Sequence, residues 1–411
     1  MLLHRSLLAL AAATSALAAR NDTFMQLVAT QAAATLAQIP APDVYPVQGA
    51  GQGSPIWATG SRNSWVAGFF SGTLLSLFAD ARRQGDGPAA AKWLAAAIAK
   101  NDALALNQNN TGTHDVGFMV FTSLGHQYLL TGNTTAGNIT LRTASALATR
   151  YAAKVGCIQS WGVFPPTNGQ SEVIIDNMLN LELLWWAGQQ GNSTFTAIAT
   201  SHADRMIADI FQPFNPGCVW HMNTYDFNSG ALLNRSSVPQ GLGLDTVWSR
   251  GQSWSVRGFA IAYRYTRLAR YLQAAQASAE CFMRLLAVAN DPATGLPLWD
   301  FNATSPKLFA SDSSALAIAT AGIIEIALAS DAATRARYLA AARRYLDILL
   351  SPSVLFTPAQ SDALLNNGTT SFPQYGIALP YGDYYLLEAV RDWDELPPAL
   401  ADEATTAAAA L

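Results

Sequence analysis

Apolar residues recur with helical spacing along almost the whole chain, and breaker residues divide this pattern into twelve segments. Strand-like signals are few and lie mostly in Gly/Pro-rich stretches such as Val163–Gln170 and Thr294–Phe301. The chain is therefore predicted to be all-α. We predict helices at residues 22–38, 64–84, 87–105, 115–131, 134–154, 175–190, 193–211, 248–267, 269–290, 312–329, 332–350 and 381–393.

The predicted helices alternate between two types. Every second one, beginning with 64–84, is apolar or aromatic on nearly all faces, as in Asp176–Ala187 (DNMLNLELLWWA), and such a helix is buried on all sides. Their partners, such as Thr334–Leu350, carry arginines among apolar positions, as one-sided outer helices do. Six inner and six outer helices joined as hairpins predict a closed (α/α)6 barrel, with an open helical solenoid as the alternative. We favour closure because the connections that enter the inner helices are long and polar, as loops around one cavity would be.

The composition raises the question of a membrane protein. Of the 411 residues 50% are hydrophobic and only 13% are charged, about half the usual ~25%. A membrane-spanning helix needs about 20 apolar residues in a row, and the longest apolar stretch here, Ser6–Leu17, is shorter. A positively charged start and a small-residue site at Ala16–Ala18 make 1–19 a predicted signal peptide, with a short buried helix as the alternative. Residues 20–411 are then predicted to form a single (α/α)6-barrel catalytic domain.

The remaining composition is typical of a secreted protein, and we expect a monomer. Chance predicts about three N-glycosylation motifs, whereas the chain has them at Asn21, Asn109, Asn133, Asn138, Asn192, Asn234, Asn302 and Asn367. Cys157, Cys218 and Cys281 allow one disulfide plus a free thiol but no disulfide framework. A net charge of -4 and the lack of a basic cluster argue against nucleic acid as a partner.

Polar and aromatic residues gather at the starts of the predicted inner helices. In a closed barrel with parallel inner helices, these starts lie at one rim, and helix N-termini favour anionic ligands. The residues are Trp65 and Phe69; His114 and Asp115; Asp176 and Asn177; Arg250, Gln252 and Trp254; Asp312, Ser313 and Ser314; and Tyr381 and Asp383.

Each of these residues also has a structural interpretation. Asp115, Asp176 and Asp312 stand where helix N-caps stand. Arg250 can form a buried ion pair, and the aromatic residues can belong to the core. The convergence of carboxylates, an arginine, a histidine and tryptophans in different hairpins favours a site instead. Two neighbouring carboxylates are the usual equipment for glycosidic chemistry, and Arg, His or Gln can bind a uronate carboxylate.

Six segments of the chain together resemble the unsaturated glucuronyl hydrolases, glycoside hydrolase family 88. The resemblance runs from about Ser64 to Trp393, and its most specific motifs are HDVGF and IIDNM–N–ELLWWA. The segments are HDVGFMVFTSLGHQYLLTGN, IIDNMLNLELLWWA, DTVWSRGQSWSVRGFAIAYRYT, LWDFNA, DSSALAIATAGIIEIA and YGDYYLLEAVRDW.

The resemblance implies an (α/α)6 barrel that releases 4,5-unsaturated uronic acid from the non-reducing end of lyase products. The implied chemistry is hydration of a vinyl ether. A general acid protonates carbon 4, water adds at carbon 5, and the resulting hemiketal opens and expels the aglycone.

The same resemblance implies roles for individual residues. Asp176 would protonate carbon 4 and then assist water, and Asp115 would be the neighbouring carboxylate that orients the sugar and favours a proton on Asp176. Ser71-Gly72 departs from the Pro-Gly that the family commonly has there, which would alter loop entry rather than chemistry. No metal or cofactor is expected, because neither metal-ligand spacing nor a phosphate-binding loop is present. The implied substrate-binding residues are Trp65, His114, His221, Gln240, Arg250 and Trp254.

Three other functions stay open. An unsaturated rhamnogalacturonyl hydrolase would share the barrel and the chemistry, although HDVGF and NLELLWWA fit the glucuronyl class better. A polysaccharide lyase could abstract a proton with Tyr263, Tyr265, Tyr381 or His221. A non-catalytic sugar-binding protein is disfavoured by the carboxylates. No pair of basic residues marks a sulfate site, so the aglycone and its sulfation stay open.

Overall fold

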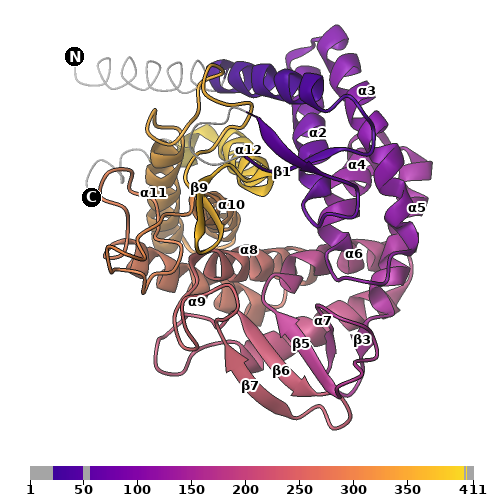
Figure 1. Cartoon of the computed structure of the whole chain (residues 1–411), viewed down its shortest axis with the longest axis vertical. Helices are drawn as coiled ribbons and strands as arrows, with labels where there is room; N and C mark the ends of the chain where they lie inside the picture. The colour runs from indigo at the N-terminus through magenta and orange to yellow at the C-terminus, as the bar shows by residue number, and fades with distance from the viewer. Residues whose placement is uncertain (1–21, 50–55, 402–403, 405–411) are drawn as a thin grey trace.

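The structure is a computed structural model that describes residues 22–49, 56–401 and 404, so the predicted signal peptide lies outside the described residues. Each of the twelve predicted helical segments contains helix (Figure 1). The helices are a first one at 22–38, α2 (Ala67–Gln84), α3 (Gly87–Leu104), a π-helix (Gly117–Gly125) continued by α4 (His126–Thr131), α5 (Thr134–Ala148), α6 (Asn177–Gln189), α7 (Ser193–Asp209), α8 (Ser249–Thr266), α9 (Ala269–Leu286), α10 (Ser313–Leu328), α11 (Ala332–Leu349) and α12 (Pro380–Asp394). A short 3-10 helix, Ala105–Asn109, follows α3.

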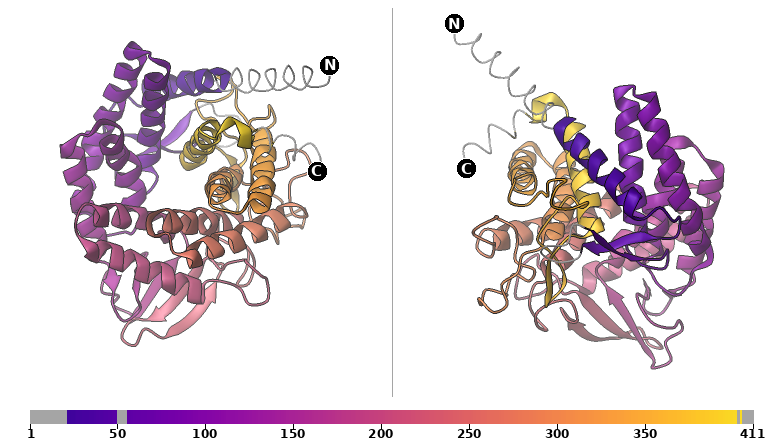
Figure 2. Two further views of the ribbon diagram at one scale, coloured as in Figure 1. Left: turned by 180° about the vertical axis from the view of Figure 1, so that it is seen from behind. Right: turned by 45° about the horizontal axis from the view of Figure 1, so that its top comes forward.

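The inner helices form a closed ring. The π-helix packs between α2 and α6, α8 packs between α6 and α10, and α12 packs against both α10 and α2. The contact between α12 and α2 closes the ring, so the closed barrel is confirmed and the open solenoid is wrong. The outer helices α3, α5, α7, α9 and α11 each pack against the inner helix of their own hairpin, as the two views of Figure 2 also show.

The inner helices are buried on every side, as their sequences predict. In α10 every residue from Ser313 to Ala327 is buried except Glu325. Small residues let neighbouring inner helices approach closely, because a Cβ at Gly68 would collide with the carbonyl oxygen of Phe118. Burial of this much apolar surface is the main stabilising contribution to the ring.

The short strands lie in the connections that enter the inner helices. The largest sheet is antiparallel, with β6 (Met222–Asp226) between β5 (Gln170–Ile174) and β7 (Leu232–Ser236). Three two-stranded sheets complete the set: β1 (Tyr45–Gly49) with β2 (Trp57–Gly60), β3 (Tyr151–Ala152) with β4 (Cys157–Ile158), and β8 (Gly368–Ser371) with β9 (Gln374–Ile377).

Some predicted boundaries were wrong. The helix predicted at 134–154 ends at Ala148, because the buried Arg150 guanidinium then binds the main-chain carbonyls of Thr111, Gln159, Trp161 and Gly162. The stretch Val163–Gln170 only reaches the first residue of β5, and Thr294–Phe301 makes isolated bridges rather than a strand.

The three cysteines divide into a pair and a single residue. Cys218, in the loop after α7, is bonded to Cys281 of α9, with 5.3 Å between their Cα atoms. Cys157 is a buried free thiol. In the described part of the chain, no helix combines the length and the apolar character needed to cross a membrane.

Candidate active site

The N-terminal ends of the inner helices surround a single open cavity of about 830 Å³, including the solvent at its mouth. Five of the eight predicted site residues line it, while His114, His221 and Trp254 do not. The lining residues are Trp65, Asp115, Trp161, Ile174, Asp176, Pro239, Gln240, Trp248, Arg250, Thr370, Ser371 and Tyr381.

Asp176 immediately precedes α6, and its side chain does not cap the helix. The carboxylate is buried, with 8% of the residue exposed, and its Oδ1 atom has no hydrogen-bond partner among the described residues. The Nδ1 atom of His221 lies 3.4 Å from Oδ1. The N-cap interpretation is therefore wrong for Asp176, and the carboxylate is available to a ligand.

The sheet at the barrel rim positions His221 beside this carboxylate. Ile174 of β5 pairs with Met222 of β6, and the Ile175 N–H donates to the carbonyl oxygen of His221 at 2.8 Å. The imidazole packs edge-on against Trp248, with 4.7 Å between the ring centroids. Neither of its ring nitrogens has a hydrogen-bond partner within the described chain.

Asp115 is more firmly held than Asp176. The Thr113 hydroxyl donates to its Oδ2 atom at 2.7 Å, and the Nε2 atom of His114 lies 3.2 Å from Oδ1. Burial raises the pKa of Asp115, but His114, Thr113 and the Arg150 guanidinium together outweigh it and lower the pKa below its usual value. These neighbours therefore favour the ionised form of Asp115.

Arg250 forms a buried ion pair and also lines the cavity, so both predicted interpretations of this residue apply. Its Nη1 atom donates to the Asp312 carboxylate and to the Thr369 carbonyl, and Nη2 donates to the Thr370 carbonyl at 2.6 Å. The guanidinium lies over Trp248, 4.7 Å from the ring centroid, and lines the cavity. Burial alone would lower the pKa of Arg250. The effects of Tyr381, Asp312 and Asp176 are together larger and raise this pKa above its usual value, so the arginine stays charged.

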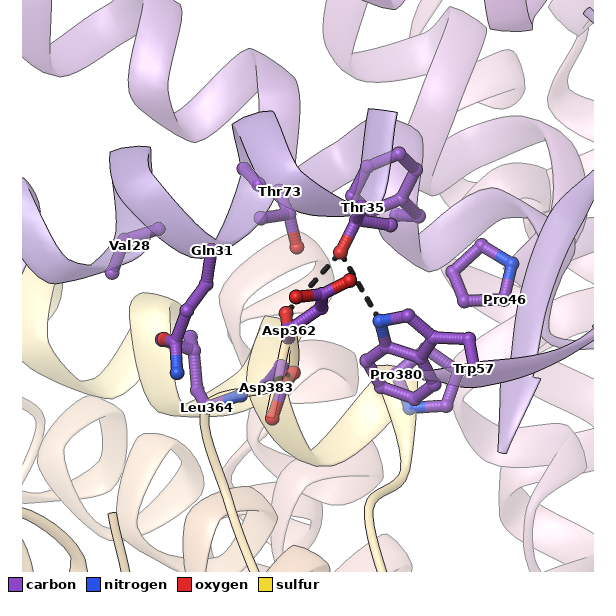
Figure 3. Close-up of a pocket in the computed structure, with 12 residues that line it drawn as sticks. Val28, Gln31, Thr35, Pro46, Trp57, Thr73, Asp362, Leu364, Pro380 and Asp383 are labelled. Carbon is purple, nitrogen blue, oxygen red and sulfur yellow. Dashed lines mark hydrogen bonds between the residues drawn. The ribbon is translucent and has the colours of Figure 1, made fainter. Parts of the chain in front are cut away.

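Asp312, Gln252 and Asp383, which the sequence also places at starts of inner helices, have structural roles. Asp312 caps α10, since its Oδ1 accepts the Ser314 N–H at 3.1 Å, so for Asp312 the N-cap interpretation is correct. Gln252 is also structural, because its side chain binds Val219, Gly217 and Ser278. Asp383 does not reach the rim. It lies in a separate small pocket beneath the first helix (Figure 3).

Aromatic rings form much of the cavity surface. Trp65 lies 5.0 Å from Tyr381 between ring centroids, and both rings line the cavity. The predicted sugar-binding Trp254 is fully buried against Phe118 behind this layer, so it is core rather than surface.

Six cavity residues were not singled out from the sequence: Trp161, Ile174, Pro239, Trp248, Thr370 and Ser371. Trp248 lies two residues before Arg250, inside the segment DTVWSRGQSW, which was the available signal. Trp161, Thr370 and Ser371 lie in connections that enter α6 and α12, and only the length and polarity of those connections pointed to them. In the described residues, no group of three or more His, Cys, Asp or Glu could hold a metal ion.

A closed ring of six helix hairpins, with two carboxylates and aromatic rings at one end, defines an (α/α)6-barrel glycoside hydrolase. No protein-family model matches the chain. It is 32% identical over 333 residues to the unsaturated glucuronyl hydrolase of Formosa agariphila (strain DSM 15362), which covers 80% of this chain and 79% of the relative. It is 32% identical over 306 residues to the unsaturated chondroitin disaccharide hydrolase of Streptococcus pneumoniae (strain R6), covering 68% and 71%.

A solved structure is similar over nearly the whole fold. The crystal structure of an unsaturated glucuronyl hydrolase specific for heparin superposes with a TM-score of 0.80 at 28% identity, covering 90% of this chain and 96% of that one. The chain belongs to the unsaturated glucuronyl hydrolase family and is a glycoside hydrolase. The family resemblance and the barrel predicted from the sequence are confirmed.

Proposed function

We propose that this enzyme releases 4,5-unsaturated glucuronic acid from the non-reducing end of lyase-generated oligosaccharides by hydrating the vinyl ether of the sugar. The observation that carries the proposal is the pair of unlike carboxylates in one cavity. Asp115 is held ionised by its neighbours, whereas the buried Oδ1 of Asp176 has no hydrogen-bond partner in the described chain.

This difference supports the acid role that we propose for Asp176. Asp115, whose pKa is lowered, is a poor proton donor, which leaves the unpartnered carboxyl group of Asp176 as the acid in this cavity. Asp176 then transfers its proton to carbon 4 of the alkene, and the resulting cation at carbon 5 is captured by water. The carboxylate of Asp176 takes a proton from this water. The hemiketal opens, and the aglycone leaves as an alcohol.

Unpartnered polar atoms support recognition of a polar ring. A buried polar group without a hydrogen bond costs about 1–3 kcal/mol, so such groups are rare unless a ligand satisfies them. Here the imidazole of His221, the Oε1 of Gln240 and the hydroxyl of Tyr381 are all buried without a hydrogen-bond partner in the described chain. The charged Arg250 beside Tyr381 adds electrostatic attraction for a uronate carboxylate.

We further propose that the enzyme acts outside the cell, as a monomer without metal or cofactor. The proposal is supported by the predicted signal peptide at 1–19 and by the Cys218–Cys281 disulfide, a bond typical of oxidising compartments. It is also supported by exposure of most of the glycosylation motifs. The exposed asparagines are Asn109, Asn133, Asn138, Asn192, Asn234 and Asn302, whereas Asn367 is half-buried.

An absorbance assay tests the catalytic proposal. Unsaturated disaccharides of the chondroitin, heparin and rhamnogalacturonan types are incubated with wild type, Asp115→Asn and Asp176→Asn. We expect wild type to remove the ultraviolet absorbance of the conjugated alkene, Asp176→Asn to be inactive while folded, and Asp115→Asn to be strongly impaired. Full activity in Asp176→Asn would refute the mechanism.

The same assay separates the alternatives. Turnover restricted to rhamnogalacturonan-type disaccharides would establish the rhamnogalacturonyl class instead. A gain of absorbance from intact polymer would establish a lyase. The relatives are named for chondroitin and heparin substrates, so the disaccharide panel also identifies the aglycone that this cavity accepts.

A further inference from the structure

Asp383 is a buried carboxylate that the catalytic chemistry does not use. It lies in the first turn of α12 and lines a small pocket shared with the first helix and with Asp362 (Figure 3). Its oxygens accept the main-chain N–H groups of Leu364 at 3.0 Å and Leu365 at 2.9 Å. Burial raises the pKa of Asp383 to about 7, against the effect of these two N–H groups. No lysine or arginine lines this pocket.

Gln31 of the first helix holds the same loop from the other side. Its Nε2 atom donates to the carbonyl oxygen of Ala363 at 2.6 Å and to those of Phe356 and Ser361 at 3.2 Å. The loop 356–365, here called the anchor loop, thus has carbonyls bound by one buried side chain and N–H groups bound by another. Figure 3 shows Gln31 and Asp383 approaching Leu364 from the first helix and from α12.

The anchor loop leads directly into the wall of the catalytic cavity. Two residues after it, the chain enters β8, where the Thr369 and Thr370 carbonyls accept hydrogen bonds from Arg250. Thr370 and Ser371 themselves line the cavity. A displacement of the anchor loop would therefore move both a cavity surface and the acceptors that orient Arg250.

We propose that Asp383 and Gln31 are positioning residues that set the affinity for substrate by fixing the anchor loop and, through it, β8. This inference rests on the proposed function, because it takes the cavity as the site of the unsaturated sugar. The carboxylates Asp115 and Asp176 lie on other elements, so the reacting groups keep their places when the anchor loop moves.

Steady-state kinetics of Asp383→Asn on an unsaturated disaccharide test the proposal. Asparagine keeps the shape and one acceptor oxygen, but its NH2 group faces a main-chain N–H. We expect KM to rise about threefold to tenfold while kcat stays within about twofold, the signature of lost uniform binding. Gln31→Met removes the carbonyl contacts of the same loop and should give the same signature, which keeps the test valid if Asp383→Asn does not fold.

Lys100 offers a matched control. Its buried Nζ atom also donates to three main-chain carbonyls, those of Ile39, Ala41 and Val44, but this loop does not enter the cavity wall. Lys100→Met should lower the melting temperature and leave KM unchanged. If Asp383→Asn and Gln31→Met also lower only the melting temperature, the positioning role is refuted.

Amide hydrogen exchange separates this inference from the proposed function. An inactive wild type across the whole disaccharide panel would refute the proposed function alone. Faster exchange at residues 364–371 in Asp383→Asn than in Lys100→Met would still support the anchor, and equal exchange would overturn it. If wild type is active, calorimetry measures binding of the disaccharide to Asp176→Asn and to the double variant that carries both Asp176→Asn and Asp383→Asn. Weaker binding to the double variant would confirm the effect on affinity.

Discussion

The two ends of the barrel use the same kinds of ionisable side chain in opposite ways. At the cavity end, Asp176 and His221 are buried with polar atoms that lack hydrogen-bond partners in the described chain. Further along the inner helices from their N-terminal ends, carboxylates and arginines neutralise one another. This closed-end network consists of Glu182 of α6, Arg257 and Arg264 of α8, Glu325 of α10 and Glu388 of α12.

The two ends differ in how charge is balanced, although the closed-end network also has two buried atoms without a hydrogen-bond partner in the described chain, the Nε of Arg257 and the Oε1 of Glu325. Arg257 binds both Glu325 and Glu388, and Arg264 binds both Glu182 and Glu325, so the network links four inner helices. A buried ion pair adds little net stability over apolar packing, but breaking one is costly. We therefore expect substitutions at the cavity end to change activity and substitutions at the closed end to change stability.

The largest expected effect is at the cavity end. Asp176→Asn should lower kcat by about 10³-fold or more, because general acid catalysis is lost. Its free energy of unfolding should stay close to that of wild type, since Oδ1 of Asp176 has no hydrogen-bond partner to lose in the described chain. Turnover of an unsaturated disaccharide and urea unfolding measure the two quantities. A large loss of stability in Asp176→Asn without loss of turnover would contradict the expectation that the cavity end controls activity rather than stability.

The closed end should show the reverse pattern. Arg257→Met leaves Glu388 buried without its arginine, and we expect the free energy of unfolding to fall by about 3–5 kcal/mol. Arg337 is the matched control because it pairs with Glu280 on the outer surface, where about half of each side chain is exposed. Arg337→Met should cost less than about 1 kcal/mol. Urea unfolding of both variants makes the test, and equal losses would contradict it.

The sequence predicts the barrel well because burial dominates its pattern. Inner helices such as α6 and α10 are apolar on all faces, and this periodicity identifies them without any tertiary information. Asp115 and Asp176 could be predicted because charged residues are rare in this chain and stand at the starts of its most apolar helices.

The remaining features depend on contacts between distant segments. Nothing local to Asp383 shows that its partners are the N–H groups of Leu364 and Leu365 rather than a sugar. Trp254 matches a family motif, yet its ring is covered by neighbouring helices. The closed-end network was not predicted at all, because Arg257 of α8 and Glu388 of α12 are paired only once the ring is closed.

Acid stability should also distinguish the two kinds of ion pair. Burial alone would raise the pKa of Glu388. The opposite effects of Arg257, Arg391 and His126 are together larger, and they lower this pKa from 4.5 to about 2. A depressed folded-state pKa means that this stabilisation is present above about pH 4.5 and is lost as the pH falls toward 2. The difference in free energy of unfolding between wild type and Glu388→Gln should therefore shrink over this range.

His126 and the surface pair provide the controls for this titration. Burial lowers the pKa of His126 to about 4, so His126 takes up its proton in the same range, and the comparison is repeated in a His126→Leu background. Glu280→Gln removes the exposed pair with Arg337 and should give a smaller difference at every pH. A difference for Glu388→Gln that does not change between pH 5 and 2 would contradict the assigned pairing.

The smallest expected effect concerns Gln240, a cavity residue whose Oε1 atom has no hydrogen-bond partner in the described chain. Because no group of the described chain uses this oxygen, it is available to a ligand, and Gln240→Leu should raise KM several-fold, equivalent to about 1 kcal/mol, with unchanged stability. Gln276 binds Ser330 between outer elements, so Gln276→Leu should leave KM unchanged. If Gln240→Leu behaves like Gln276→Leu, the unpartnered oxygen does not contribute to substrate binding, and the contrast between the two ends of the barrel rests on Asp176 and His221.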